Sequence, residues 1–435
     1  MKRPHLKFFY SHLQLIFSFL LISSSLKAQK IMETGGKKMP DEWIDKDTKH
    51  KIIKLTRRQG NNMSFYFHNN PFVGNKSDGY RMIFYGTDYL NTSENDSIKQ
   101  ETGNIPADNK QLYSVDLGTL LPESTGKVEQ LTSQSSPMNG EIVAPNNKLV
   151  YYQIKDSVFS TNIDTKTTKL VYVFPADFKA NITTLNSNET LLGGAWSSDK
   201  EKEILRNNPN KSSYFDLIYE AREPRTLFTL NVSTGELKKI FTDSAWLNHV
   251  QFSSKDPDIL MFCHEGPWHK VDRIWTINLK TREVRLMHKR TMDMEIAGHE
   301  WFAPDGKTIW FDLQQPRSVS FFVAGADVKT GKETKYAISR DEWSIHFNIS
   351  PDQKLFCGDG GDPGQVAKAK DGEWIYLFKP DGNKFKSERL VNMRHHNYKL
   401  EPNVHFSPDG KWIIFRANFE GNTNVYAVEV KESGQ

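Results

Sequence analysis

Residues 407–418 read SPDGKWIIFRAN, a Pro-Asp-Gly turn followed at once by an apolar strand. Proline presets φ and Asp-Gly suits a tight hairpin, so the stretch predicts a turn that opens a β-strand. Seven copies of this pattern run along the chain: SDGYRMIFYG (77–86), APNNKLVYYQ (144–153), LNSNETLLGG (185–194), SSKDPDILMFCH (253–264), APDGKTIWFD (303–312), SPDQKLFCGD (350–359) and SPDGKWIIFRAN (407–418). The chain is therefore built from an internal β-repeat.

A second hairpin follows most copies, with a polar turn between two apolar strands. Examples are FTLNVSTGELKKIF (228–241), WTINLKTREVRLM (275–287) and AGADVKTGKETKYAI (324–338). Two hairpins make a four-stranded sheet, and repeats of this length and strand content are typical of a β-propeller. Seven copies predict an all-β, seven-bladed β-propeller. A β-sandwich with coincidental turns is the alternative, and the repeated hairpins favour the radial arrangement.

Three segments outside the repeat add to this architecture. KHKIIKLTR (49–57) predicts a strand that completes the last blade, which closes the ring and hides its sheet edges. Residues 91–111 are polar and predict a loop. Residues 197–224 are predicted to be partly helical and to overhang one face. Long ordered loops are where propellers carry their chemistry.

The composition is that of a globular protein with ample length for a large core. Of the 435 residues, 25% are charged and 37% are hydrophobic, and the net charge is +4. No basic block is long enough to predict a nucleic-acid partner. Only two cysteines occur, Cys263 and Cys357, both in apolar runs. They either form one disulfide or pack as two buried thiols, and they cannot make a cysteine-based metal site.

The N-terminus predicts a cleaved secretory signal. Positive charge precedes the short apolar run LQLIFSFLLI (13–22), and Leu26-Lys27-Ala28 fits a small-residue cleavage site. A membrane anchor is the alternative, but the run is too short to span a bilayer comfortably. We expect residues 1–28 to be removed and residues 29–435 to form a single propeller domain. The mature protein is then periplasmic or secreted, with no membrane anchor.

Histidines recur near the end of one strand in successive repeats. His249, His299, His346 and His405 each precede the turn of their repeat, and we expect them to occupy equivalent positions in four consecutive blades. The equivalent strand lines the axis of a propeller, so the side chains are expected to converge on one funnel. Imidazole is both a common metal ligand and a base near neutral pH. The alternative for any one of them is a buried histidine that finds its partners inside the fold.

The strand LEPNVHF (400–406) adds oxygen ligands to this picture. Glu401, Asn403 and His405 alternate with apolar residues, and the period of two places them on one strand face. A carboxylate, an amide oxygen and an imidazole on one face suit a hard or borderline divalent cation.

The chain resembles the oligogalacturonate lyases, polysaccharide lyase family 22, over nearly the whole mature region. The strings that carry the resemblance are LNVSTGE (230–236), WLNH (246–249), FCHEGP (262–267) with Val271-Asp272, HEWFAPDG (299–306) and GDGGD (358–362). The resemblance implies a seven-bladed propeller that cleaves oligogalacturonides by β-elimination. A base removes the C5 proton beside the carboxylate, and the sugar linked through O4 leaves. Such a site must neutralise the carboxylate and stabilise an enolate-like intermediate.

The resemblance also implies roles for individual residues. In the family a histidine is the base, an arginine assists, and a manganese ion binds substrate. His249 in WLNH matches the catalytic histidine, and His299 in HEWF matches one metal-ligand histidine. The family arginine aligns within a residue or so of Arg225, with Pro224 at the strict match, and Arg222 is also near. We therefore predict His249 and Arg225 as the catalytic residues.

The metal motif departs from that of the family. The family has Gln-x-x-His-x-His before the last Pro-Asp-Gly turn, whereas Tyr398, Glu401 and Asn403 stand at these positions. A different site for a divalent cation is the expectation, with manganese ahead of calcium; the alternative is that no metal binds. The departure also widens the expected substrate to another uronic-acid oligosaccharide. The predicted metal ligands are His299, His346, Glu401, Asn403 and His405.

The stretch FCHEGPWHKVDRIW (262–275) is interpreted as one wall of the funnel. His264 and Glu265 match the family, whereas Trp268 and His269 replace different residues. Trp268 is expected to stack on a sugar ring, and the charged groups are expected to meet carboxylates. The alternative is a structural loop whose carboxylates tie down neighbouring backbone. The predicted substrate-binding residues are Arg222, His264, Glu265, Trp268, His269 and Arg273.

Three functions are open at this point. The first is an exported lyase for uronic-acid oligosaccharides, with a histidine base and a divalent cation. The second is a non-catalytic propeller that binds glycans or envelope proteins, which the altered ligands would suit. The third is a hydrolase with paired carboxylates, for which Glu265 and Glu401 are the candidates. The substrate and the oligomeric state are left open by the sequence.

Overall fold

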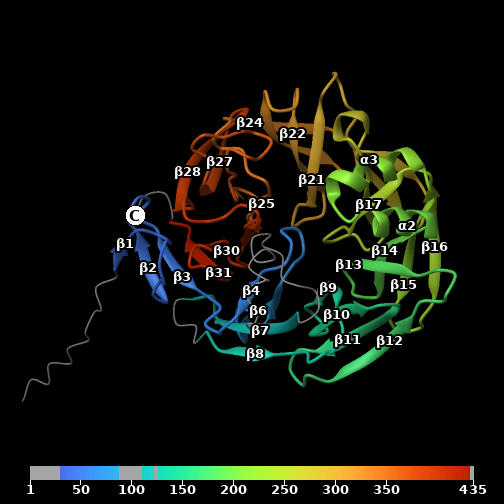
Figure 1. Ribbon diagram of the computed structural model, residues 1–435, viewed down its shortest axis with the longest axis horizontal. Coiled ribbons are helices and arrows are strands. Elements are labelled where there is room, and N and C mark those ends of the chain that lie inside the picture. The colour runs from blue at the N-terminus through green and yellow to red at the C-terminus, as the bar shows by residue number, and fades with distance from the viewer. Residues whose placement is uncertain (1–29, 88–109, 122–125, 432–435) are drawn as a thin grey trace, which may run out of the picture.

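The chain forms β-sheets that stand around a central axis, the arrangement of a β-propeller (Figure 1). The computed structural model describes residues 30–87, 110–121 and 126–431. The predicted signal segment and nearly all of the polar loop predicted at 91–111 lie outside these residues. No helix in the described ranges is long and apolar enough to cross a membrane.

One sheet contains both ends of the described chain, in the order β1-β2-β3-β31-β30-β29. Strand β3 lies antiparallel to β31 and pairs Ile52 with Val428. This pairing confirms that the strand predicted at 49–57 joins the last repeat, while β1 and β2 extend the sheet outward (Figure 1). The bounds are β1 Ile31–Met32, β2 Glu42–Asp45, β3 Lys51–Lys54, β29 His405–Phe406, β30 Trp412–Ala417 and β31 Asn424–Glu429.

Three sheets have four strands each: β12-β11-β10-β9, β13-β14-β15-β16 and β17-β18-β19-β20. Each consists of the two successive hairpins predicted from the repeat. The bounds are β9 Asn139–Ala144, β10 Leu149–Ile154, β11 Ser157–Asn162, β12 Thr168–Val173, β13 Ala180–Leu185, β14 Leu191–Ser197, β15 Arg225–Asn231, β16 Leu237–Asp243, β17 Trp246–Phe252, β18 Ile259–Glu265, β19 Ile274–Asn278 and β20 Val284–Leu286.

An eight-stranded sheet consists of two four-stranded runs, β21 to β24 and β25 to β28. A single parallel pair, Ala337 with Lys384, joins the outer strands β24 and β28. The bounds are β21 Ile296–Phe302, β22 Thr308–Gln314, β23 Phe321–Asp327, β24 Glu333–Ile338, β25 Phe347–Ile349, β26 Phe356–Gly358, β27 Trp374–Asp381 and β28 Lys384–Asn392.

The sheet of the first repeat has a divided inner strand. Strands β4 and β5 both pair with β6, and residues 64–71 leave the sheet between them. We call residues 64–71 the inner loop, because its side chains meet the central histidines described below. The bounds are β4 Asn61–Met63, β5 Phe72–Asn75, β6 Gly79–Thr87, β7 Gln111–Gly118 and β8 Val128–Gln130.

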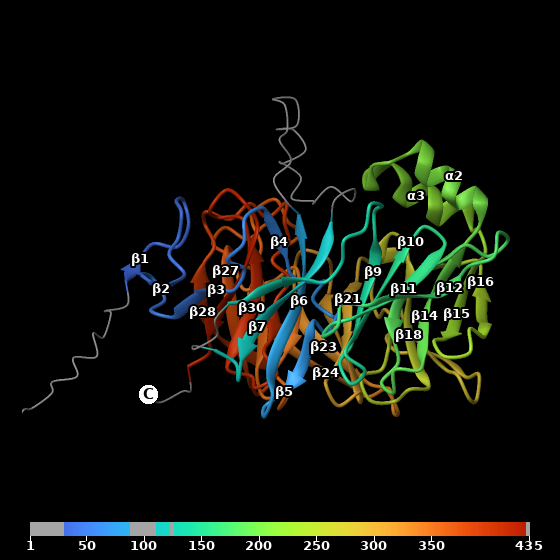
Figure 2. The same cartoon turned by 90° about the horizontal axis from the view of Figure 1, so that it is seen from below.

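Two helices form the insertion predicted at 197–224, and they stand above one end of the sheets (Figure 2). Helix α2 spans Asp199–Asn207 and helix α3 spans Lys211–Ala221. The Ser198 hydroxyl accepts the Glu201 N–H at 3.2 Å and caps α2. The predicted helical overhang is therefore confirmed.

Burial along the strands follows their place in the sheets. In β15 all residues but the last are buried, because neighbouring sheets cover both faces, whereas the outer strand β12 has no buried residue. Cys263 and Cys357 are both free and buried. Of the two possibilities for the cysteines, the structure shows buried thiols, and burial raises the pKa of both.

Candidate active site

Three histidines occupy the equivalent positions predicted from the repeat. His249, His299 and His346 each lie four residues before the residue that closes the turn of its repeat. Those closing residues donate their backbone N–H across the turn in the same way at 2.8–2.9 Å: Ser253, Ala303 and Ser350. The rings of His299 and His346 lie 4.8 Å apart between centroids. The structure therefore brings these side chains together near the axis.

The fourth equivalent position belongs to Asn403. Ser407 closes its turn like the other closing residues, and Asn403, with His405 two places further on, lies four residues before it. The prediction that His405 shares the position of the other three histidines is wrong, because His405 lies only two residues before the residue that closes its turn, whereas the others lie four residues before theirs. Both ring nitrogens of His405 lie within 3.3 Å of backbone carbonyls of Asn403, Tyr66 and Asn69.

The backbone at these positions is unusual for residues with side chains. His249, His299 and Asn403 have φ of 46°, 51° and 53°. The pairing of β17 with β18 shifts register around His249, and that of β21 with β22 shifts around His299. Such bulges turn a side chain away from the regular pleat, and left-handed non-glycine residues cluster at functional sites. A left-handed residue at a register shift therefore redirects these side chains.

A buried ion network supports His249. Arg273 is 1% exposed and binds the carboxylates of both Glu265, at 2.5 Å, and Glu300. Trp268 donates its indole N–H to Glu265 at 2.9 Å, and His249 Nε2 lies 3.7 Å from the other oxygen of the same carboxylate. Glu265 therefore connects the loop of the stretch 262–275 to the histidine, as the predicted funnel wall requires.

The protonation of this group follows from burial and charge. Burial would raise the pKa of Glu265, but the neighbouring Arg273 charge lowers it to about 2. Burial, helped by Arg273, lowers the pKa of His249 below its ordinary value although Glu300 and Glu265 oppose the shift. Burial, helped by His346 and His249, holds the pKa of His299 well below its ordinary value. Both imidazoles are thus neutral near pH 7, which is the form that accepts a proton.

His346 lies in a second chain of contacts. Its Nδ1 is 2.9 Å from Asp359 Oδ2, and its Nε2 is 3.3 Å from the hydroxyl of Tyr66 and 3.7 Å from Glu401 Oε2. The phenyl ring of Phe67 stacks on the imidazole with centroids 4.7 Å apart. Tyr66 and Phe67 belong to the inner loop, so this loop completes the site.

Sequence reasoning missed Tyr66, Asp359 and Glu300. Tyr66 and Phe67 stand in SFYFHNN (64–70), where aromatic residues and a histidine are crowded as they are in the stretch 262–275. That crowding could have drawn attention to the inner loop. Nothing in the spacing places a residue of the first repeat against histidines of later repeats, because only ring closure brings them together.

The five predicted metal ligands do not fit a metal site in the structure. The amide of Asn403 is engaged with the Phe67 N–H at 2.9 Å and the Glu401 carbonyl at 3.0 Å, and His405 is engaged as described above. In the described ranges no group of three or more His, Cys, Asp or Glu side chains has an arrangement that could hold a metal ion. His299 differs from Asn403 and His405, because its buried Nδ1 has no hydrogen-bond partner among the described residues and could bind a ligand.

Arg225 does not lie free in the site. Its guanidinium is paired with Glu201 of α2 and donates to the Leu247 carbonyl at 2.9 Å. The same group lies 5.3 Å from the Trp246 ring, which contacts Phe215 of α3 at 5.2 Å. Arg225 therefore connects the two helices to β17, the strand of His249.

Three predicted substrate-binding residues lie apart from the central histidines. His264 stacks on Trp275 with centroids 4.8 Å apart and lies 3.8 Å from Asp243. Arg222 lies over the Tyr219 ring at the end of α3. His269 is in the 3₁₀ turn η3 (Trp268–Lys270), where its carbonyl accepts from Arg290. Glu265, Trp268 and Arg273 are thus the members of the predicted set that adjoin the cluster.

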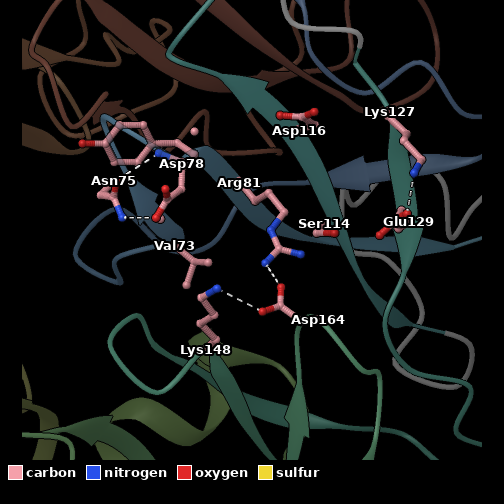
Figure 3. Close-up of a pocket in the computed structure, with 13 residues that line it drawn as sticks. Val73, Asn75, Asp78, Arg81, Ser114, Asp116, Lys127, Glu129, Lys148 and Asp164 are labelled. Atoms are coloured by element: carbon pink, nitrogen blue, oxygen red, sulfur yellow. Dashed lines mark hydrogen bonds and ion pairs between the residues drawn. The ribbon is translucent and has the colours of Figure 1, made fainter.

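A separate hollow of about 370 Å³ lies between the first and second repeats (Figure 3). Its walls include Arg81 and Lys148, both paired with Asp164, and Lys127, paired with Glu129 at 2.9 Å. The hollow lies at the β5–β6 turn, toward the end of the sheets opposite the helices (Figure 2). Its charges are compensated locally, and none of the predicted site residues lines it.

Comparison with known proteins agrees with this architecture. Two curated relatives are an oligogalacturonide lyase of Pectobacterium atrosepticum, 24% identical over 68% of this chain and 78% of that protein, and an oligogalacturonate lyase of Dickeya dadantii, 25% identical over 72% and 83%. Two solved structures share the fold. An oligogalacturonate lyase in complex with manganese has a TM-score of 0.73 at 23% identity, covering 92% of this chain and 99% of that one. The oligogalacturonate lyase of Vibrio parahaemolyticus has 0.72 at 22%, covering 91% and 97%.

The family assignment rests on most of the chain. The sequence model of the oligogalacturonate lyase family, Pectate_lyase22, matches residues 89–434. The match includes the strands of His249, His299 and His346 and the loop of Glu265, and it begins after the inner loop. The chain therefore belongs to the oligogalacturonate lyase family and is a lyase.

Proposed function

We propose that this protein is an exported lyase that cleaves uronic-acid oligosaccharides of the pectin-derived, oligogalacturonate type by β-elimination, with His249 as the base. The observation that carries the proposal is the partly buried, neutral imidazole of His249, held at a left-handed bulge beside Glu265 in the centre of the ring. The substrate class rests on the curated relatives, which are oligogalacturonide and oligogalacturonate lyases.

The proposed reaction begins at the C5 proton beside the substrate carboxylate. His249 takes this proton, the C–H electron pair forms the C4=C5 double bond, and the C4–O4 bond breaks. A general base at this position contributes about 10²- to 10⁴-fold to the rate. The carboxylate of Glu265 stabilises the imidazolium that forms, as an acidic partner does in other histidine bases.

Substrate binding is assigned to groups that adjoin His249. The unpartnered Nδ1 of His299 can bond a sugar hydroxyl, and Trp268 offers an apolar ring next to it, with centroids 5.4 Å apart. Lys211, at the start of α3, is close enough to influence the protonation of both His249 and His299, so it can attract the carboxylate. Arg225 is proposed to position the helices over this site. No step is assigned to a metal ion, because Asn403 and His405 are otherwise engaged and the described residues contain no group of three or more His, Cys, Asp or Glu side chains that could hold one.

We further propose that the ring has seven blades. The four-stranded runs are β5 to β8, β9 to β12, β13 to β16, β17 to β20, β21 to β24, β25 to β28, and β29 to β31 with β3. Export is proposed from the signal-like N-terminus alone.

The test is the ultraviolet absorbance of a conjugated unsaturated uronate, followed on a panel of uronic-acid oligosaccharides. We expect a rise with wild type and a loss of at least about 10²-fold in His249→Ala. His264→Ala is the matched control, because it removes a histidine from the same repeat outside the cluster. Full activity in His249→Ala would contradict the base assignment, and no absorbance on any substrate would contradict the elimination.

A further inference from the structure

The inner loop is fixed against the strands that carry the central histidines. The Phe67 N–H donates to Asn403 Oδ1 at 2.9 Å, and the Phe67 carbonyl accepts from Asn348 at 3.1 Å. The Arg416 guanidinium donates to the Ser64 carbonyl at 3.0 Å. These contacts join the first repeat to the last two, so the loop is a rigid part of the site.

Tyr66 of this loop lies against both His249 and His346. Its hydroxyl is 3.3 Å from His346 Nε2, and its ring centroid is 6.4 Å from that of His249. The side chain is partly exposed, whereas His346 behind it is fully buried. Of these two side chains, Tyr66 is therefore the one that a ligand beside His249 can reach.

His346 is held in place behind Tyr66 by a buried carboxylate. Asp359, which is fully buried, accepts the His346 backbone N–H at 2.7 Å, the Asn403 N–H at 3.1 Å and His346 Nδ1 at 2.9 Å. With two backbone donors on this carboxylate, Nδ1 is a donor as well. Glu401 adds a second carboxylate 3.7 Å from Nε2, and the face of Phe67 covers the ring.

We propose that Tyr66 is a catalytic residue that protonates the leaving O4 oxygen, with His346 and Asp359 as positioning residues. This inference rests on the proposed function and completes it, since a sugar oxygen leaves more readily when an acid other than the base protonates it. Neither the sequence motifs nor the region matched by the family model, which begins at residue 89, includes Tyr66.

Each proton that moves during one turnover is accounted for. The C5 proton goes to His249, and the C–H electrons form the double bond. The C4–O4 electrons go to O4, which receives the phenolic proton of Tyr66. The phenolate then takes a proton from water. The hydroxide formed in this way removes the proton from His249, so no net proton or electron is consumed.

The electrostatics agree with this role for Tyr66. Burial, together with the negative charges of Glu401 and Glu300, raises the pKa of Tyr66 well above its ordinary value. The phenol therefore keeps its proton until the leaving oxygen develops charge. His249 is neutral under the same conditions. Tyr66 can therefore donate a proton while His249 accepts one.

The test uses two substrates that differ only in the leaving group. One is a natural oligosaccharide, and the other is a uronide with 4-nitrophenoxide at C4, which departs without being protonated. We expect Tyr66→Phe to lose at least about 10²-fold in kcat on the natural substrate and less than about threefold on the activated one. His249→Ala should lose activity on both.

The outcomes separate the two proposals. Full activity of Tyr66→Phe on the natural substrate, or equal loss on both substrates, would overturn the role of Tyr66 while His249 stands. Activity of His249→Ala on both would overturn the proposed base instead. Tyr66→Phe keeps the ring contacts, so its folding is checked by thermal unfolding. Asp359→Asn should show the same split between substrates in weaker form, which a merely structural role would not produce.

Discussion

The centre of the ring and the hollow at the β5–β6 turn contain the same kinds of charged side chain and differ in how those charges are compensated. In the hollow, Arg81 and Lys148 share Asp164, and no described lining residue has a buried side-chain nitrogen or oxygen without a partner. In the centre, unpartnered atoms remain on Arg273, His299 and Glu300. Such atoms also occur elsewhere in the described chain, for example on Trp246, Trp301 and Trp310. Buried groups left without partners are costly, so those on Arg273, His299 and Glu300, which lie around His249, favour a ligand site in the centre.

Removing one arginine from each region should give the largest difference in stability between the two regions. Arg273→Met leaves two buried carboxylates without their cation, and we expect it to lower the free energy of unfolding by about 3–5 kcal/mol. Arg81→Met, the matched control, removes a partly exposed pair and should cost about 0–1 kcal/mol. Both are measured by urea unfolding. Equal losses of unfolding free energy would mean that the central ion network stabilises the fold no more than the pair of Arg81 with Asp164 does.

The dependence of stability on acidic pH tests whether the charges in the centre stabilise the fold. The pKa of Glu265 is lowered from 4.5 to about 2 in the folded protein, so its ionised form stabilises the fold above pH 4.5. We expect wild type to be more stable than Glu265→Gln at pH 7, and the difference to shrink as the pH falls from 4.5 toward 2. Thermal unfolding across this range measures it. A constant difference would show that Glu265 acts through its shape and not its charge.

The smallest expected effect is a shift of the pH–rate profile. The pKa of His249 is lowered by burial and by Arg273, opposed by Glu300 and Glu265, and lowered again slightly by Lys211. Because the base must be neutral, the acidic limb of kcat/KM should fall below the ordinary histidine value of 6.5. Lys211→Met should move this limb slightly upward. A limb above 6.5 in wild type would contradict the balance of charges described for the site.

Sequence patterns predicted most of the fold because its signals are local. The Pro-Asp-Gly turns, the alternating strands and the closing strand at 49–57 depend on neighbours a few residues apart, and all appear as predicted. The offset from each turn also located His249, His299 and His346, since the repeat keeps the same register. The same reasoning failed for His405, which also precedes its turn but lies two residues closer to it than the other three histidines do.

The sequence by itself determined the repeat, the closing strand and the positions of the central histidines, because these follow from periodicity and turn chemistry. Only the tertiary structure decided which atoms those histidines can use. Asn403 and His405 are occupied by the inner loop, Arg225 is bound to Glu201, and Tyr66 meets His346 across 280 positions of sequence. Such contacts arise when the ring closes and the first repeat packs against the last. No local pattern in the chain encodes them.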